Sequence, residues 1–141
     1  MNSSPHERIF LLVEDNPDDV FLMSRVFKKE KIEGILDVVT DGKQAIEYLE
    51  RKDKLRNDGQ TKVPELIFLD LKLPFLNGFD VLDWIRRQPG LISLPVVVLT
   101  SSLEDQDRER ADCFGVPYFV KPPTAQLLRD ALRFAASGSN M

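Results

Sequence analysis

Five short apolar segments recur along the chain, and each is followed by a segment with helical character. Three of them are continuous runs of Val, Ile, Leu and Phe, as expected of strands that are buried on both faces of a parallel sheet. The second segment instead alternates around Asp37, which favours a strand nearer an edge. The five segments are Ile9 to Val13, Ile35 to Val39, Leu66 to Leu69, Val96 to Leu99 and Val116 to Val120.

Residues that typically start or end helices separate these segments. Pro17 follows Asn16 at a position where a missing N–H costs little, and Gly115 stands where a helix is expected to end. Five strand-then-helix units predict a doubly wound α/β sandwich with right-handed crossovers. The expected architecture is a flavodoxin-like (βα)5 fold, with a parallel five-stranded sheet in the order 2-1-3-4-5. Further helix starts are marked by Asp41-Gly42, Asn77-Gly78 and Pro123-Thr124.

The length and composition fit one domain. The chain has 141 residues, and 43% of them are hydrophobic, which is enough for a packed core. We expect a single domain over residues 1–141, with a core from about residue 8 to about residue 136 and flexible tails at both ends. The charged stretch from Arg51 to Lys62 is compatible either with a longer helix or with a solvated loop.

Charge and hydropathy exclude several classes of partner. A net charge of -4 does not favour binding to nucleic-acid phosphates, and the apolar runs are far shorter than the about 20 residues that span a bilayer. The first residues lack the basic start and apolar run of a secretion signal. The single cysteine, Cys113, excludes an internal disulfide and fits a reducing compartment. We therefore predict a cytoplasmic protein that binds neither DNA nor membrane.

Four of the five apolar segments are followed by polar residues that are candidates for a functional site. Glu14 and Asp15 follow the first, Asp70 the third, Thr100 the fourth and Lys121 the fifth. Ligands bind outside the carboxyl ends of the strands in sheets of this kind. The first and third strands are neighbours in the predicted order, with backbones about 5 Å apart, so we expect the three acids to crowd together at one edge.

This group of residues suggests phosphoryl chemistry centred on Asp70. Three crowded carboxylates repel one another unless a cation intervenes, and Mg²⁺ prefers one or two carboxylates together with water and a phosphate oxygen. Lys121 would supply a mobile positive charge for an anionic group on Asp70, and Thr100 a hydroxyl that can donate to the same group. Together they describe a carboxylate nucleophile, a metal and a cation around a phosphoryl group in transfer.

Four sequence motifs carry a resemblance to a known family. Each is unspecific alone, but all four occur in order and each at a strand end. Over about Ile9 to Phe134 the chain resembles the response-regulator receiver family. The motifs are Leu11-Leu12-Val13-Glu14-Asp15-Asn16, Leu69-Asp70-Leu71-Lys72-Leu73-Pro74-Phe75-Leu76-Asn77-Gly78, Leu99-Thr100-Ser101 and Tyr118-Phe119-Val120-Lys121-Pro122.

The resemblance implies a metal-dependent acceptor. Asp70 would accept a phosphoryl group from a histidine kinase or a small phosphodonor. Asp15, Asp70 and the backbone carbonyl of Lys72 would ligate Mg²⁺, while Glu14 stands where many relatives have Asp, so its coordination, direct or through water, is left open. The chain would catalyse only its own phosphorylation and dephosphorylation, and Lys72 and Ser102 could tune the rate of hydrolysis.

The resemblance also implies a conformational switch. Thr100 and Lys121 would contact the phosphoryl group, Tyr118 would turn inward when Thr100 moves, and the Lys121-Pro122 peptide would be cis. The output would be a surface of the fourth helix, fifth strand and fifth helix that forms a homodimer, with Leu103 and Phe114 as candidates for it. We expect the charged run Glu104 to Arg110 to be a solvated helix face, with at most a share in partner binding.

Two features point to a subfamily. The Leu-Val-Glu-Asp-Asn-Pro-Asp-Asp start and the charged insert before Pro64 are similar to those of stand-alone regulators that partner phytochrome-type histidine kinases. We expect no attached output domain in a chain of this length.

Three alternatives are compatible with parts of the pattern. A Mg²⁺-dependent phosphatase with an aspartate nucleophile usually has a second acid two residues on, where this chain has Lys72. A flavin-binding carrier of the same fold would need a phosphate loop where Glu14 and Asp15 stand. A degenerate receiver that serves as a constitutive interaction module is disfavoured by the intact acids, Thr100 and Lys121. Any one of these residues alone fits an ordinary turn, cap or surface position, so their joint placement carries the hypothesis.

Overall fold

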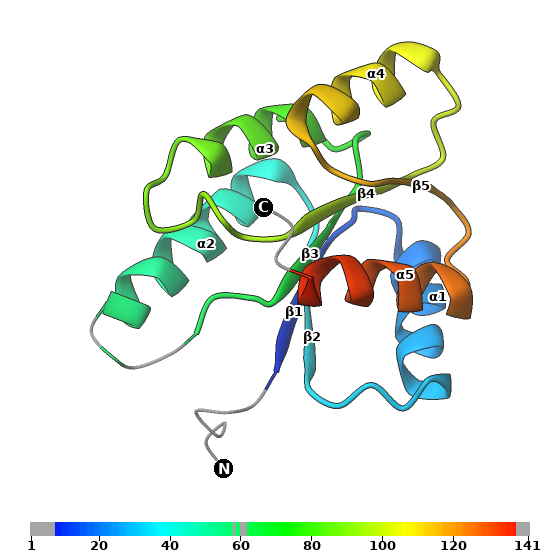
Figure 1. Cartoon of the computed structure of the whole chain (residues 1–141), viewed down its shortest axis with the longest axis horizontal. Helices are drawn as coiled ribbons and strands as arrows, with labels where there is room; N and C mark the ends of the chain where they lie inside the picture. The colour runs from blue at the N-terminus through cyan, green and yellow to red at the C-terminus, as the bar shows by residue number, and fades with distance from the viewer. Residues whose placement is uncertain (1–7, 58, 60–61, 138–141) are drawn as a thin grey trace.

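Strands and helices alternate along the whole described chain (Figure 1). A computed structural model describes residues 8–57, 59 and 62–137. The flexible tails predicted at both ends fall mainly on residues 1–7 and 138–141, outside the described residues. In chain order the elements are β1 (Ile9–Val13), α1 (Pro17–Lys29), β2 (Ile35–Val39), α2 (Gly42–Asn57), β3 (Leu66–Leu69), α3 (Gly78–Arg86), β4 (Val96–Thr100), α4 (Asp105–Phe114), β5 (Tyr118–Val120) and α5 (Ala125–Ala136).

The strands form one parallel sheet in the order β2-β1-β3-β4-β5, which confirms the predicted doubly wound fold. The residues of β1, β3 and β4 are all buried, whereas β2 and β5 at the edges are largely half-buried. Val13 pairs with Val39 on one side and with Leu69 on the other. The ends of β1 and β3 therefore lie level, and the residues that follow them emerge side by side.

Helices cover both faces of the sheet and create two separate cores. Along β1, Leu11 and Val13 point into one core, and Phe10 and Leu12 into the other. The first core is closed mainly by α2 and α3, and the second by α1 and α5, as the arrangement in Figure 1 illustrates. This alternation explains why the strand segments are apolar throughout.

The helix boundaries follow the predicted signals. The Asn16 side chain accepts a hydrogen bond from the Asp18 N–H, and Pro17 occupies the first turn of α1. Thr124 caps α5 by accepting from the Leu127 N–H, and Gly115 ends α4 with a φ of 72°, where the absence of Cβ avoids strain. These caps fix where each helix starts or ends relative to the strand before it.

Two strand boundaries differ from the sequence prediction, and one of them is the end of β4, which lies at Thr100 and not at Leu99. β5 begins at Tyr118 and not at Val116, because the Val116 N–H donates to the Ala111 carbonyl in closing α4 and Pro117 has no N–H to donate. For the charged stretch from Arg51 to Lys62, which was compatible with a helix or a loop, the structure shows that residues 51–57 extend α2. Among the described residues, no helix combines the length and apolar character needed to cross a membrane.

Candidate functional site

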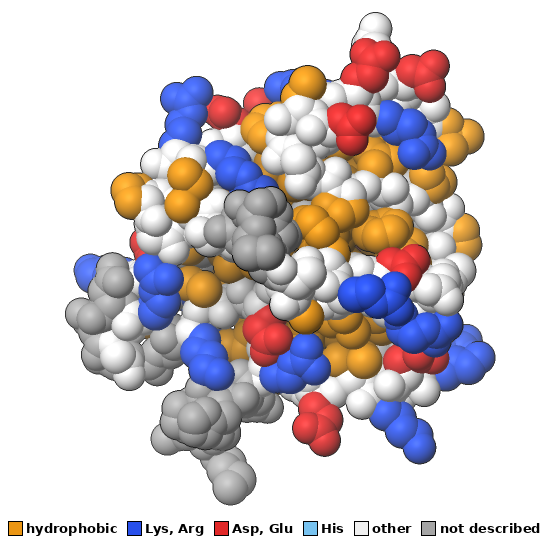
Figure 2. Space-filling view, viewed as in Figure 1, with side chains coloured by type: hydrophobic (Ala, Val, Ile, Leu, Met, Phe, Trp, Pro, Cys, Tyr) orange, Lys and Arg blue, Asp and Glu red, His pale blue; other side chains and the backbone are white. Residues whose placement is uncertain are grey.

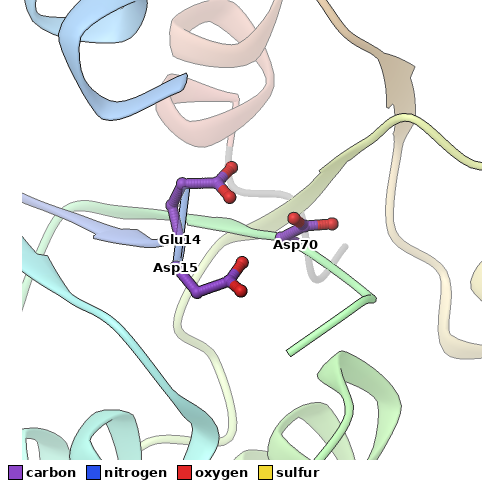
Figure 3. A group of neighbouring side chains, drawn as sticks. All are labelled: Glu14, Asp15 and Asp70. Atoms are coloured by element: carbon purple, nitrogen blue, oxygen red, sulfur yellow. The ribbon is translucent and has the colours of Figure 1, made fainter. Parts of the chain in front are cut away.

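Three carboxylates meet at the carboxyl edge of β1 and β3. One oxygen from each of Glu14, Asp15 and Asp70 lies within 4.8 Å of the other two, and Figure 3 shows Glu14 and Asp15 directed toward Asp70. The sheet positions them, because the Asp70 N–H donates to the Val13 carbonyl at 3.1 Å and the Glu14 N–H to the Val39 carbonyl at 3.0 Å. The predicted crowding of the three acids is confirmed.

The three acids differ in burial. Glu14 is 1% exposed and Asp70 is 4% exposed, whereas Asp15 is exposed to solvent. Two buried carboxylates and one exposed carboxylate thus converge, and they offer the hard oxygen donors that divalent cations such as Mg²⁺ prefer. The donor set therefore fits the predicted metal, with Asp15 on the side from which an ion would enter.

Lys121 lies inside this acidic group. Its Nζ is 2.6 Å from Oε1 of Glu14, 2.8 Å from Oδ2 of Asp19 and 3.0 Å from Oδ2 of Asp70. An ammonium carries three N–H donors, so one side chain serves three acids. The sequence predicts that Lys121 faces Asp70, whereas its contact with Asp19 was not predicted. Asp19 stands in the first turn of a helix that starts directly beyond the acidic pair, which brings its backbone near the site but does not show in the sequence which way its side chain faces.

Burial and charge act in opposite directions on these groups. Burial raises the pKa of Glu14 to about 7, with the Asp70 charge adding to the rise and the Lys121 contact opposing it. Burial lowers the pKa of Lys121, but its bonds to Asp19, Glu14 and Asp70 outweigh that effect, and the net shift is upward. Lys121 is therefore a permanent cation at neutral pH, whereas Glu14 gains or loses its proton near pH 7.

Thr100 and Tyr118, the predicted switch residues, are connected through Ser102. Thr100 is fully buried at the end of β4, and its Oγ1 accepts a hydrogen bond from the Ser102 N–H at 3.3 Å. The Tyr118 hydroxyl donates to the Ser102 carbonyl at 2.8 Å, and the Tyr118 side chain is half-buried. The loop after β4 thus contacts both residues.

The start of α4 belongs to the same network. Ser102 Oγ donates to Oδ2 of Asp107 at 2.6 Å, and the Arg108 guanidinium lies 4.6 Å from the centre of the Tyr118 ring. The run Glu104 to Arg110 is exposed as expected, except for Asp107, which is half-buried. The helix presents Asp107 and Arg108 to the loop and to β5, an orientation that depends on helix rotation and is not visible in the charge pattern.

The segment after Asp70 contacts the Asp70 carboxylate on the side away from Lys121. The Lys72 N–H donates to Oδ1 of Asp70 at 3.3 Å, while its ammonium reaches Oε2 of Glu104 at 4.0 Å. Gly78, at the start of α3, packs directly on the Asp70 carbonyl, where a Cβ would collide with the backbone. The Lys121-Pro122 peptide is cis, as the family resemblance implied. Backbone contacts thus fix Asp70 on both sides.

Comparison with known proteins identifies relatives with this arrangement of elements. The response regulator Rcp1 of Synechocystis sp. is 38% identical over 100 residues, which cover 71% of this chain and 66% of Rcp1. A structure of the Mn²⁺-bound form of response regulator Rcp1 is similar with a TM-score of 0.73 and 32% identity, covering 92% of each chain. These relatives are single regulators of comparable size.

Two further solved structures are similar over nearly the whole chain. The bacteriophytochrome response regulator AtBRR has a TM-score of 0.79 and 35% identity, with 94% of each chain covered. The phosphorylated cyanobacterial phytochrome response regulator RcpA has a TM-score of 0.75 and 31% identity, covering 93% of this chain and 95% of that one. The family model of the response regulator receiver domain matches residues 10–133, and the chain therefore belongs to that family of two-component signalling domains.

Proposed function

We propose that this receiver domain is a phosphorylation switch that accepts a phosphoryl group on Asp70 from the phosphohistidine of a sensor kinase. One observation carries the proposal. The nearly buried Asp70 carboxylate converges with Glu14 and Asp15 and also contacts the ammonium of Lys121, 3.0 Å away. A nucleophile, a site for a divalent cation and a fixed positive charge are the parts that phosphoryl transfer requires.

The transfer uses the carboxylate itself as the nucleophile. An oxygen of Asp70 attacks phosphorus in line with the bond to the donor imidazole, the P–N bond breaks, and its electron pair stays on the imidazole nitrogen. Lys121 faces the acceptor oxygen Oδ2 and balances the negative charge of the phosphoryl oxygens. Hydrolysis ends the activated state: water attacks phosphorus, the P–O bond to Asp70 breaks, and inorganic phosphate leaves. The domain catalyses only these two reactions on itself.

The residues that would hold Mg²⁺ are Glu14, Asp15 and Asp70, together with the backbone carbonyl of Lys72. When bound, the ion supplies positive charge that offsets the phosphoryl oxygens. Support comes from the oxygen-only donor set and from the similarity to Rcp1, which has been solved in a Mn²⁺-bound form. The similarity to RcpA, which has been solved as a phosphorylated regulator, supports phosphorylation of this fold.

Phosphorylation would be transmitted through the residues joined at Ser102. Thr100 turns its hydroxyl toward the phosphoryl oxygens and gives up the Ser102 N–H, and Tyr118 moves inward. The surface formed by α4, β5 and α5 then changes and supports a homodimer. Figure 2 favours this face, because hydrophobic side chains gather in its middle, with acidic groups toward α4 and basic groups over α1 and α5. Leu103, which is 72% exposed, lies next to α4.

The input would be a phytochrome-type sensor histidine kinase in the cytoplasm. The support is the similarity to AtBRR, a bacteriophytochrome response regulator, and to RcpA, a cyanobacterial phytochrome response regulator. A protein of net charge -4 that signals through a surface of α4, β5 and α5 needs neither DNA nor membrane contact to do so.

The proposal is tested by treating the protein with acetyl phosphate and Mg²⁺ and measuring its intact mass. The wild type is expected to gain one phosphoryl group, Asp70→Asn to gain none, and the control Asp112→Asn, at an exposed position of α4, to gain one. Omitting Mg²⁺ should abolish the gain. Equal labelling of Asp70→Asn and the wild type, or no labelling of any of the three proteins, would refute the assignment. Sustained turnover of a generic phosphoester would favour a phosphatase instead.

A further inference from the structure

Asp19 is a fourth acid at the acceptor, and it lies outside the group of three that converges on a metal position. It stands in the first turn of α1, and its Oδ2 accepts a hydrogen bond from Nζ of Lys121 at 2.8 Å. The contact joins residues 102 positions apart in sequence. The Lys121 side chain is only 10% exposed and that of Asp19 is 23% exposed. The pair is therefore shielded from most solvent.

We propose that Asp19 is a positioning residue for Lys121. It holds the ammonium beside the acceptor and remains its partner when Glu14 and Asp70 are engaged by a divalent cation. The inference rests on the proposed function, because it assigns Asp19 a role in the charge state of that same site.

Lys121 and a divalent cation would compete for the same carboxylate oxygens. Lys121 lies 2.6 Å from Glu14 and 3.0 Å from Asp70, and both acids belong to the group that fits a cation. Two cations repel each other at such distances, so these contacts of Lys121 weaken when the acids bind a metal. A nearly buried ammonium without a partner is costly. Asp19 is the contacting acid that the cation does not claim.

The position of Asp19 is fixed by its helix. Asn16 caps α1 and Pro17 occupies the first turn, so the Asp19 backbone is set by structure that the metal acids do not share. A carboxylate in the first turn of a helix is also stabilised as an anion by the N-terminal end of the helix dipole. Asp19 is thus a fixed negative charge to which Lys121 can remain attached.

A purely structural ion pair between α1 and the segment after β5 predicts something different. It would change the stability of the protein equally with and without metal, and it would not alter metal affinity. The positioning role predicts that, without the Asp19 charge, Lys121 binds Glu14 and Asp70 more firmly and so competes more strongly with the ion. The decisive measurement is therefore the dissociation constant of Mg²⁺, which does not depend on phosphorylation.

The experiment is a calorimetric titration of the metal-free protein with Mg²⁺. Asp19→Asn is expected to weaken binding by roughly tenfold, and Asp18→Asn is the matched control. Asp18 carries the same charge in the same helical turn but is exposed, so it reports the general loss of negative charge. Asp19→Glu, which keeps the charge, should recover most of the affinity. Asp19→Ser replaces Asp19→Asn, under the same criteria, if the latter does not fold.

A double-mutant cycle shows whether the effect passes through Lys121. On a Lys121→Met background, Asp19→Asn should weaken Mg²⁺ binding no more than Asp18→Asn does. An equal loss for Asp19→Asn and Asp18→Asn in the wild-type background would overturn the proposal, and so would a persistent tenfold loss without Lys121. If Asp70 is not labelled by acetyl phosphate but the Mg²⁺ affinity loss of Asp19→Asn depends on Lys121 as expected, the proposed phosphorylation is refuted and the positioning of Lys121 by Asp19 is not.

Discussion

The hydroxyl of Tyr118 and the backbone carbonyl of Ser102 are joined by a hydrogen bond of 2.8 Å that ties β5 to the loop after β4. The N–H of the same Ser102 donates to the Thr100 hydroxyl. One residue of the loop therefore serves as the hydrogen-bond partner of both Thr100 and Tyr118. Substitutions at these positions should report on the switch directly.

Tyr118→Phe removes this hydrogen bond with little change in volume. We expect the resting protein to lose about 1 kcal/mol of free energy of unfolding. If the ring leaves Ser102 on activation, the loss should shrink when beryllofluoride and Mg²⁺ are added. Urea unfolding of the wild type and the variant, with and without these additives, measures both values. An identical loss in the two conditions would mean that Tyr118 keeps its partner throughout.

Tyr48→Phe is the counterpart near the other edge strand of the sheet, β2. The Tyr48 hydroxyl donates to Oδ2 of Asp37 at 2.6 Å from a nearly buried position, and burial and this contact both raise its pKa. Because the carboxylate loses a donor in partly buried surroundings, we expect a loss of about 1–3 kcal/mol in the free energy of unfolding. Unlike the Tyr118 effect, this loss should be independent of beryllofluoride. A loss that changes with beryllofluoride would place Tyr48 within the switch.

Asp15→Asn should separate metal binding from folding. Asp15 is exposed, so its charge gains little from the fold and repels Glu14 and Asp70, and the metal-free variant should be at least as stable as the wild type. The wild type should gain about 2.7 kcal/mol when Mg²⁺ is present at 100 times its dissociation constant, and the variant much less. Thermal unfolding in EDTA and in Mg²⁺ provides the comparison. An equal gain in both proteins would exclude Asp15 as a ligand.

Glu14→Gln should flatten the pH dependence of stability in the absence of metal. The folded protein binds the Glu14 proton with a pKa of about 7, against an ordinary value of 4.5, so the folded state holds more protons between these values. The free energy of unfolding of the wild type should therefore fall as pH rises from 4.5 to about 7, by up to about 3 kcal/mol. Urea unfolding in EDTA across this range should show a smaller fall for Glu14→Gln. Parallel curves would contradict the elevated pKa.

Gly78→Ala should disturb the acceptor through its backbone. A Cβ at this position collides with the Asp70 carbonyl and with Cα of Leu71, so either α3 or the acceptor has to shift. We expect a loss of about 1–3 kcal/mol together with slower labelling by acetyl phosphate. Gly115→Ala is the control, because its φ of 72° costs stability at the end of α4 far along the chain from Asp70. Slower labelling in both variants to the same degree would point to general destabilisation.

Much of the fold could be predicted because the buried strands leave a simple trace in the sequence. Each strand of the middle of the sheet is packed on both faces and reads as a continuous apolar run, and the residue after the run marks the carboxyl edge. Glu14, Asp15 and Asp70 could be placed together on that basis alone. The start of β5 was less predictable, since the Val116 N–H is used by the end of α4.

Three of the contacts that the sequence did not reveal come from helices. Asp19, Asp107 and Arg108 reach the site from the first turns of α1 and α4, and whether such a residue faces the site depends on how its helix is rotated and how far its side chain extends. In sequence they are ordinary surface charges. Acidic residues in a first helical turn are common for dipole reasons alone, so their type carries no further signal.

The direct packing of Gly78 on the Asp70 carbonyl has a consequence for engineering this domain. There is no free space between Gly78 and the Asp70 carbonyl. A residue inserted next to Gly78 should therefore displace the Asp70 carboxylate relative to Glu14 and Lys121. Residues 62–65 lead into the amino end of β3, which is the end of the strand opposite Asp70. Reporter peptides or fluorescent labels belong on that side, where added chain length leaves the acceptor undisturbed.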